Sequence, residues 1–173
     1  MIEIPGNLIL FICLIRCVQY LIKSPFKYAR AFWLAGILTF VAAIRRELNY
    51  LPDLWVPSDF TLLAHSYYWW EDVVLTVIYL AIIGLLVYSR HYAWAIIKRV
   101  PWYLYVMVAT LAVLQYMGER AIVFPENIGV FVEELSETLI YVIALAYLWR
   151  LNLNEYVGVS QGTNDLHYQT ATR

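Results

Sequence analysis

Long apolar runs separated by short polar segments dominate the chain as far as residue 150. A helix needs about 20 mostly apolar residues to cross the hydrocarbon core of a bilayer. Five segments reach this length, some only with their interfacial ends included. They cover residues 4–22, 31–44, 73–89, 101–117 and 128–149, and the second is expected to extend through RRELNY. The pattern predicts an all-α, polytopic membrane helical bundle of about five transmembrane helices.

The polar segments predict how these helices are connected. KSPFKYAR forms a short polar turn, and RHYAWAIIKR places basic ends around apolar residues, as in a short interfacial helix. Pro101 suits the first turn of the helix that follows. Residues 152–173 are polar and lack an apolar period, which predicts a flexible tail. The predicted domains are therefore a transmembrane bundle over residues 1–151 and a tail over residues 152–173.

Composition supports the membrane prediction. The chain is 62% hydrophobic and only 14% charged, whereas soluble proteins carry about 25% charged residues. Aromatic residues make up 17% of the chain, and tyrosine and tryptophan concentrate at the two membrane–water interfaces. These values exclude an ordinary soluble domain.

The distribution of charge predicts orientation, because cytoplasmic loops carry an excess of lysine and arginine. One side of the predicted bundle holds Lys23, Lys27, Arg30, Arg90, Lys98, Arg99, Arg150 and Arg173. The other side holds Arg45, Arg46 and Arg120, together with most of the acidic residues. We therefore expect a multi-pass protein of the bacterial inner membrane, with its N-terminus outside and its tail in the cytoplasm.

The acidic residues form short clusters at the predicted outer ends of the helices. Within EELSE, Glu137 shares a helix face with Glu133 and Glu134, and Tyr141 continues that face inward. Acids at a helix N-terminus are stabilised by about 0.3–1 kcal/mol each. This effect explains Glu133 and Glu134, and likewise Glu71 and Asp72, but not Glu137, which lies deeper.

Arg16 lies near the middle of the first predicted helix. A charge at this depth costs about 2.5–3.5 kcal/mol on insertion scales, so the side chain needs a partner inside the bundle. The side chain leans toward the N-terminus of its helix, which is the outer side. The deepest acid there is Glu137, and we expect the two residues to pair.

Two main interpretations of the acidic layer are open. In the first, a structural ion-pair network joins Arg16, Arg46, Glu47, Glu119, Arg120, Glu133 and Glu137. In the second, carboxylates bind a divalent cation, for which they are suitable hard ligands. The candidate metal ligands are Glu47, Glu119, Glu134, Glu137 and His65. Close carboxylates also share protons, so a proton-linked or catalytic site is a third interpretation.

The sequence leaves enzymatic activity undecided. It contains no HExxH, GxSxG, P-loop or GxGxxG motif, and no catalytic residue is assigned. Nucleic-acid binding is not expected, because the chain has no basic surface for it. Cys13 and Cys17 lie four residues apart in an apolar run and are expected to pack in the interior.

The order Arg46–Glu47, Glu119–Arg120 and Glu133–Glu134–Glu137 resembles an RE, (D/E)R and EExxE pattern found in small uncharacterised bacterial inner-membrane proteins. In those proteins an acidic residue follows the RE pair, where this chain has Asn49. The resemblance implies an inner-membrane location and no particular activity.

Two functional hypotheses follow from the sequence. The first is a non-enzymatic subunit or scaffold that contacts membrane lipid and other membrane-protein subunits. The alternative is a cation- or metal-binding membrane protein, with a membrane-embedded, metal-dependent hydrolase as its catalytic form.

Overall fold

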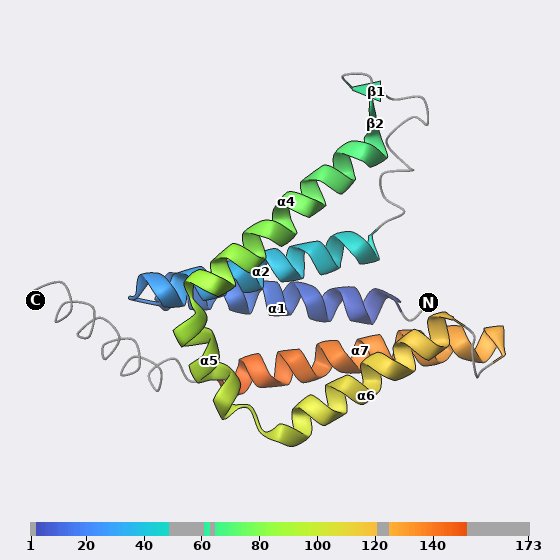
Figure 1. Cartoon of the computed structure of the whole chain (residues 1–173). Helices are drawn as coiled ribbons and strands as arrows, with labels where there is room; N and C mark the ends of the chain where they lie inside the picture. Colours follow the sequence, from blue (N-terminus) through green and yellow to red (C-terminus); the bar gives the residue numbers. More distant parts are fainter. Residues whose placement is uncertain (1–2, 49–60, 63–64, 121–124, 152–173) are drawn as a thin grey trace, which may run out of the picture.

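The computed structural model describes residues 3–48, 61–62, 65–120 and 125–151. These residues are almost entirely helical, which confirms the all-α prediction (Figure 1). The helices are α1 (Glu3–Lys23), α2 (Lys27–Glu47), α4 (Tyr67–Tyr88), α5 (Arg90–Arg99), α6 (Trp102–Glu119) and α7 (Glu126–Arg150). A two-residue antiparallel pair, β1 (Thr61–Leu62) and β2 (His65–Ser66), precedes α4 and was not predicted.

The long helices lie side by side in the order α4, α2, α1, α7, α6. Helix α1 packs against both α2 and α7, while α4 packs on α2 and α6 packs on α7. Helix α5, a short helix as predicted for RHYAWAIIKR, runs across one end of this layer (Figure 1). Helices α1 and α7 are parallel, since Gly6 lies beside Tyr141 and Tyr20 contacts Leu148.

Three described helical segments are long and apolar enough to cross a membrane. They are Pro5–Lys23, Lys27–Glu47 and Trp69–Tyr88. Helices α5 and α6 meet at a bend of 96° and provide a fourth span if they count as one. Helix α7 is long enough but carries too many charges to qualify by composition. Three or four spans are thus supported, and five remains a prediction.

Helices α4 and α7 both begin earlier than the sequence predicted, and this changes where their acids lie. Helix α4 begins at Tyr67 and has no acidic residue in its first turn. Glu133 lies seven residues beyond the first residue of α7, about two turns into the helix. The helix-dipole effect fades within the first turn, so our dipole explanation for these acids is wrong.

The main hydrophobic core lies at the end of the bundle where α5 crosses it. Cys13 and Cys17 are buried there as free thiols, as expected, and pack with Tyr20, Trp33 and residues of α5. The Tyr20 hydroxyl lies within hydrogen-bonding distance of the carbonyl oxygens of Leu148 and Leu151. Helix C-termini leave such carbonyls unpaired, so Tyr20 joins α1 to the end of α7.

Candidate functional site

Two consecutive arginines at the end of α2 contact different helices. Side chains one residue apart on a helix point in different directions. Arg45 forms an ion pair with Glu71 of α4. Arg46 lies on the other side, with its Nη2 3.6 Å from Oε1 of Glu137 on α7. The end of α2 therefore connects to neighbours on both of its sides.

The contact between α2 and α7 depends on a tyrosine that lies between two carboxylates. The Tyr141 hydroxyl oxygen is 2.7 Å from Glu137 Oε1 and 3.2 Å from Glu47 Oε1. Its single proton is donated to one carboxylate at a time, so the hydroxyl can serve either. We call Arg46, Glu47, Glu137 and Tyr141 the α2–α7 cluster.

The α2–α7 cluster spans helices that α1 separates, because α1 packs against both of them. Gly6 of α1 lies directly beside Tyr141. A Cβ atom added to Gly6 would lie 3.7 Å from both the Tyr141 ring and Thr138 Oγ1, which is ordinary contact. Helix α1 thus lies beside α7 at the level where the Tyr141 side chain extends toward α2.

The carboxylates of these ion pairs are more enclosed than the arginines. The Glu137 and Glu71 side chains are 15% and 16% exposed, whereas Arg46 is 63% exposed. Long basic side chains often keep their charged group accessible while their stem covers apolar surface. The negative charges are therefore held between helices and the positive charge of Arg46 lies at the surface.

A close helix crossing brings the end of α6 next to the acids of α7. A Cβ atom on Gly118 would lie only 2.5 Å from the carbonyl oxygen of Gly129. Glu119 follows Gly118 directly, and Glu133 lies within electrostatic range of Glu119, Glu134 and Glu137. Four of the predicted acids thus gather at this end of α7.

Arg120 and Arg16 do not join these ion pairs in the part of the chain that the structure describes. The Arg120 guanidinium lies 5.7 Å from the ring centre of Tyr116 on its own helix. Arg16 donates a 2.9 Å hydrogen bond to Gln19, and its guanidinium carbon lies 3.9 Å from the Trp149 ring centre. The predicted Arg16–Glu137 pair is therefore wrong.

The error comes from counting both helices from the same outer boundary. Gly6 of α1 lies level with Thr138 and Tyr141, so α7 begins about three turns before α1 does. Arg16 is consequently level with Trp149. Twelve residues separate Trp149 from Glu137, which is about 18 Å along the helix axis.

The described residues do not form an assembled set of metal ligands. Among them, no group of three or more His, Cys, Asp or Glu side chains is arranged to hold a metal ion. Glu47 and Glu137 meet at Tyr141, while the side chain of His65 lies outside the described part. Binding at Glu47, Glu119, Glu134, Glu137 and His65 stays a prediction.

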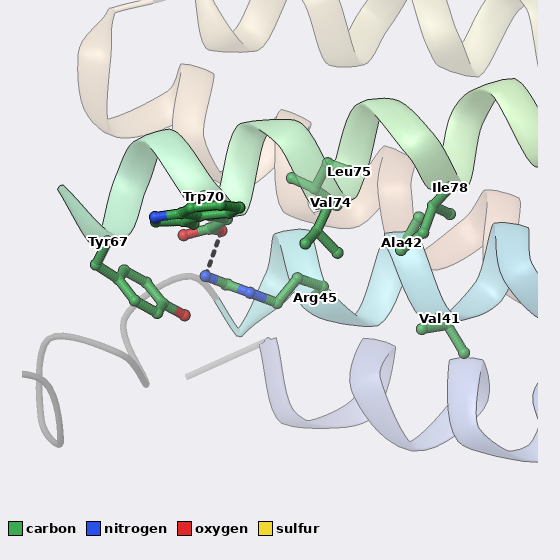
Figure 2. Close-up of a pocket in the computed structure, with 9 residues that line it drawn as sticks. Val41, Ala42, Arg45, Tyr67, Trp70, Val74, Leu75 and Ile78 are labelled. Atoms are coloured by element: carbon green, nitrogen blue, oxygen red, sulfur yellow. Dashed lines mark ion pairs between the residues drawn. The ribbon is translucent and has the colours of Figure 1, made fainter. Parts of the chain in front are cut away.

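A pocket between α2 and α4 was missed by the sequence analysis. It has a volume of about 340 Å³, and its walls are mainly apolar side chains of the two helices. The Arg45–Glu71 ion pair lies at one end, beside Trp70 and near Tyr67 (Figure 2). A pocket depends on how two helices cross, and the sequence does not show this. The aromatic residues that precede the third apolar run were the one sequence feature that could have indicated the pocket.

No protein-family model, curated protein or solved structure matches this chain. Its function has to be inferred from these contacts and from the sequence pattern.

Proposed function

We propose that the chain is a five-span protein of the bacterial inner membrane that acts as a non-enzymatic subunit or scaffold. Helix α7 has 25 residues and is about 37 Å long, enough to cross a hydrocarbon core of about 30 Å. Glu137 lies next to Arg46 of α2 and Glu133 lies beside Gly118 of α6, which lowers the cost of placing these two acids in a span. The apolar character of α1, α2 and α4 supports the same proposal.

The orientation proposal is N-out and C-in. Basic residues lie at the end of α1, the start of α2, both ends of α5 and the end of α7. These helix ends gather on one side of the layer in Figure 1, around the hydrophobic core. The positive-inside tendency favours this side as cytoplasmic.

The observation that carries the scaffold proposal is the pair of opposite connections made by Arg45 and Arg46. Through them one helix end is tied to α4 and to α7 at once. Such contacts fix how helices are arranged at an end where the described residues form no buried aromatic core like that of the other end. A structural role accounts for these charges without a substrate.

The second candidate function is cation binding, which the excess of carboxylates favours. Among the described residues, Arg46 is the positive charge near three carboxylates, those of Glu47, Glu133 and Glu137. Two carboxylates around one hydroxyl form part of an oxygen-rich coordination set for a hard divalent cation. A metal-dependent hydrolase would require such a cation.

Fusion reporters test the topology. A reporter after Arg173 is expected in the cytoplasm, and a reporter inserted in residues 50–59 is expected outside. Reversed signals would contradict both the orientation and an outward-facing acidic layer.

Arg46→Gln separates the two functions, with Arg120→Gln as the matched control. Under the scaffold proposal Arg46→Gln lowers the thermal midpoint in detergent, and Ca²⁺, Mg²⁺, Mn²⁺ or Zn²⁺ does not restore it. Arg120→Gln has little effect, because Arg120 is exposed and stacks on its own helix. Restoration by a divalent cation would favour the second function instead. Elemental analysis of the wild type against Glu134→Gln and Glu137→Gln would then measure the bound metal.

A further inference from the structure

The lining of the pocket between α2 and α4, which we call the slot, extends further along α4 than along α2. It extends from Tyr67 in the first turn of α4 to Ile78, which is about 16 Å along the helix axis. That length is about half of a hydrocarbon core of about 30 Å, and so matches one leaflet. Val41, Val74 and Leu75 contribute apolar wall between these ends (Figure 2).

The pocket is small. Its volume of about 340 Å³ is near the lower end of the range of about 300–1,000 Å³ for small-ligand pockets. A single flexible hydrocarbon chain is a suitable occupant of an apolar pocket of this size.

The charged end of the pocket carries both signs. Arg45 uses Nη2 for Glu71, and its Nη1 donates a 3.4 Å hydrogen bond to the Leu48 carbonyl oxygen. A guanidinium has five N–H donors and a carboxylate has about four acceptor positions, so this pair has capacity for a further partner of each charge. The Arg45 and Glu71 side chains are 26% and 16% exposed. Because Nη2 of Arg45 is buried against Glu71, a further partner of Arg45 has to approach its other nitrogens.

We propose that this pocket holds one acyl chain of a zwitterionic phospholipid, whose phosphate contacts Arg45 and whose ammonium group contacts Glu71. Both contacts are charge-assisted hydrogen bonds, which are the stronger kind. An anionic lipid satisfies Arg45 but leaves Glu71, which lines the pocket, facing excess negative charge. Trp70, at the same end, is of a type that favours the membrane interface. The inference rests on the proposed membrane location.

Native mass spectrometry of the full chain in detergent tests this proposal. The probes are phosphatidylethanolamine, phosphatidylglycerol and diacylglycerol with identical acyl chains. Phosphatidylethanolamine is expected to bind about tenfold more tightly than either of the others, as the loss of one hydrogen bond to a charged group would predict. Equal binding of all three lipids would overturn the proposal.

Two neighbouring valines of α4 provide a matched pair of variants. Val74 lines the pocket and is 54% exposed, while Val77 is 59% exposed and is not part of the lining. Val74→Phe is expected to weaken phosphatidylethanolamine binding about tenfold by filling the slot, and Val77→Phe to leave it unchanged. Glu71→Gln is expected to remove the preference over phosphatidylglycerol while diacylglycerol binding stays the same.

Other outcomes identify a different occupant. If Val74→Phe alters the oligomeric state and leaves lipid binding unchanged, the slot is an interface between copies and the lipid proposal is wrong. Carbonate extraction of membranes separates this failure from failure of the proposed function. A chain that stays in the membrane pellet but shows no lipid preference contradicts only the pocket inference, whereas an extracted chain contradicts the membrane location.

Discussion

The two ends of the helix layer are held together in different ways. At the α5 end, Cys17, Tyr20 and Trp33 form a buried core, and Tyr20 bonds to backbone carbonyls. At the opposite end, α2 connects to α4 and α7 through charged side chains and one tyrosine. Van der Waals contacts among many buried atoms together stabilise a helix bundle more than a partly exposed ion pair, which contributes about 0–1 kcal/mol. We infer that the α5 end supplies most of the stability, while the charged end sets helix arrangement and ligand access.

The largest expected effect is on the aromatic core. Trp33 is 2% exposed and packs against Tyr20 with ring centres 4.6 Å apart. Trp33→Ala should lower the free energy of unfolding by about 3–5 kcal/mol, because it leaves a cavity. Trp102→Ala is the control, since Trp102 is 75% exposed. Similar losses from both variants, measured by denaturant unfolding in detergent, would contradict a core concentrated at the α5 end.

The backbones of α6 and α7 pack tightly where the two helices cross at the charged end. Gly118→Ala should destabilise by about 1–3 kcal/mol, because the added methyl group meets the Gly129 carbonyl and the two backbones must separate. Gly84 is the matched helical glycine, with nothing within 4 Å of an added Cβ. Gly84→Ala should be neutral or stabilise by up to about 1 kcal/mol through helix propensity. Equal behaviour of the two variants in thermal unfolding would show that the crossing is not tight.

These contrasts also show what the sequence could and could not predict. The pattern of apolar runs located all five long helices, although α4 begins at Tyr67 and α7 at Glu126, both earlier than predicted. Clustering of acids near Arg46 and Glu47 was predicted in outline. The partner of Arg16 was not, because it depends on the axial offset between α1 and α7, which places Gly6 level with Thr138 and Tyr141. Such an offset is a property of tertiary packing and leaves no periodic signal in either helix.

A smaller loss of stability is expected when either Tyr141 or Tyr20 loses its hydroxyl, and a second substitution distinguishes the two residues. Tyr141→Phe should cost about 1–2 kcal/mol, because Glu47 and Glu137 lose their shared donor. Adding Glu47→Gln should recover part of this loss, since an amide donates a hydrogen bond and removes one negative charge. Tyr20→Phe should cost a similar amount but gain nothing from Glu47→Gln. If Glu47→Gln raised the thermal stability of Tyr20→Phe, the two ends of the helix layer would be energetically coupled. The distinction between them would then be wrong.

The smallest expected effect is the coupling between individual charges, measured by double-mutant cycles. Arg46→Gln and Glu137→Gln should be non-additive by about 0.5 kcal/mol or slightly more, since the two groups are in contact but Arg46 is largely exposed. Arg16→Gln and Glu137→Gln should add within about 0.3–0.5 kcal/mol, because about 18 Å of helix separates Glu137 from the level of Arg16. The Arg16→Gln variant is expected to lose the contacts with Gln19 and Trp149 whether or not Glu137 is present. If Arg16 were coupled to Glu137 more strongly than Arg46 is, Arg16 would have to lie at the charged end. Glu137 would then connect α7 to α1 rather than to α2.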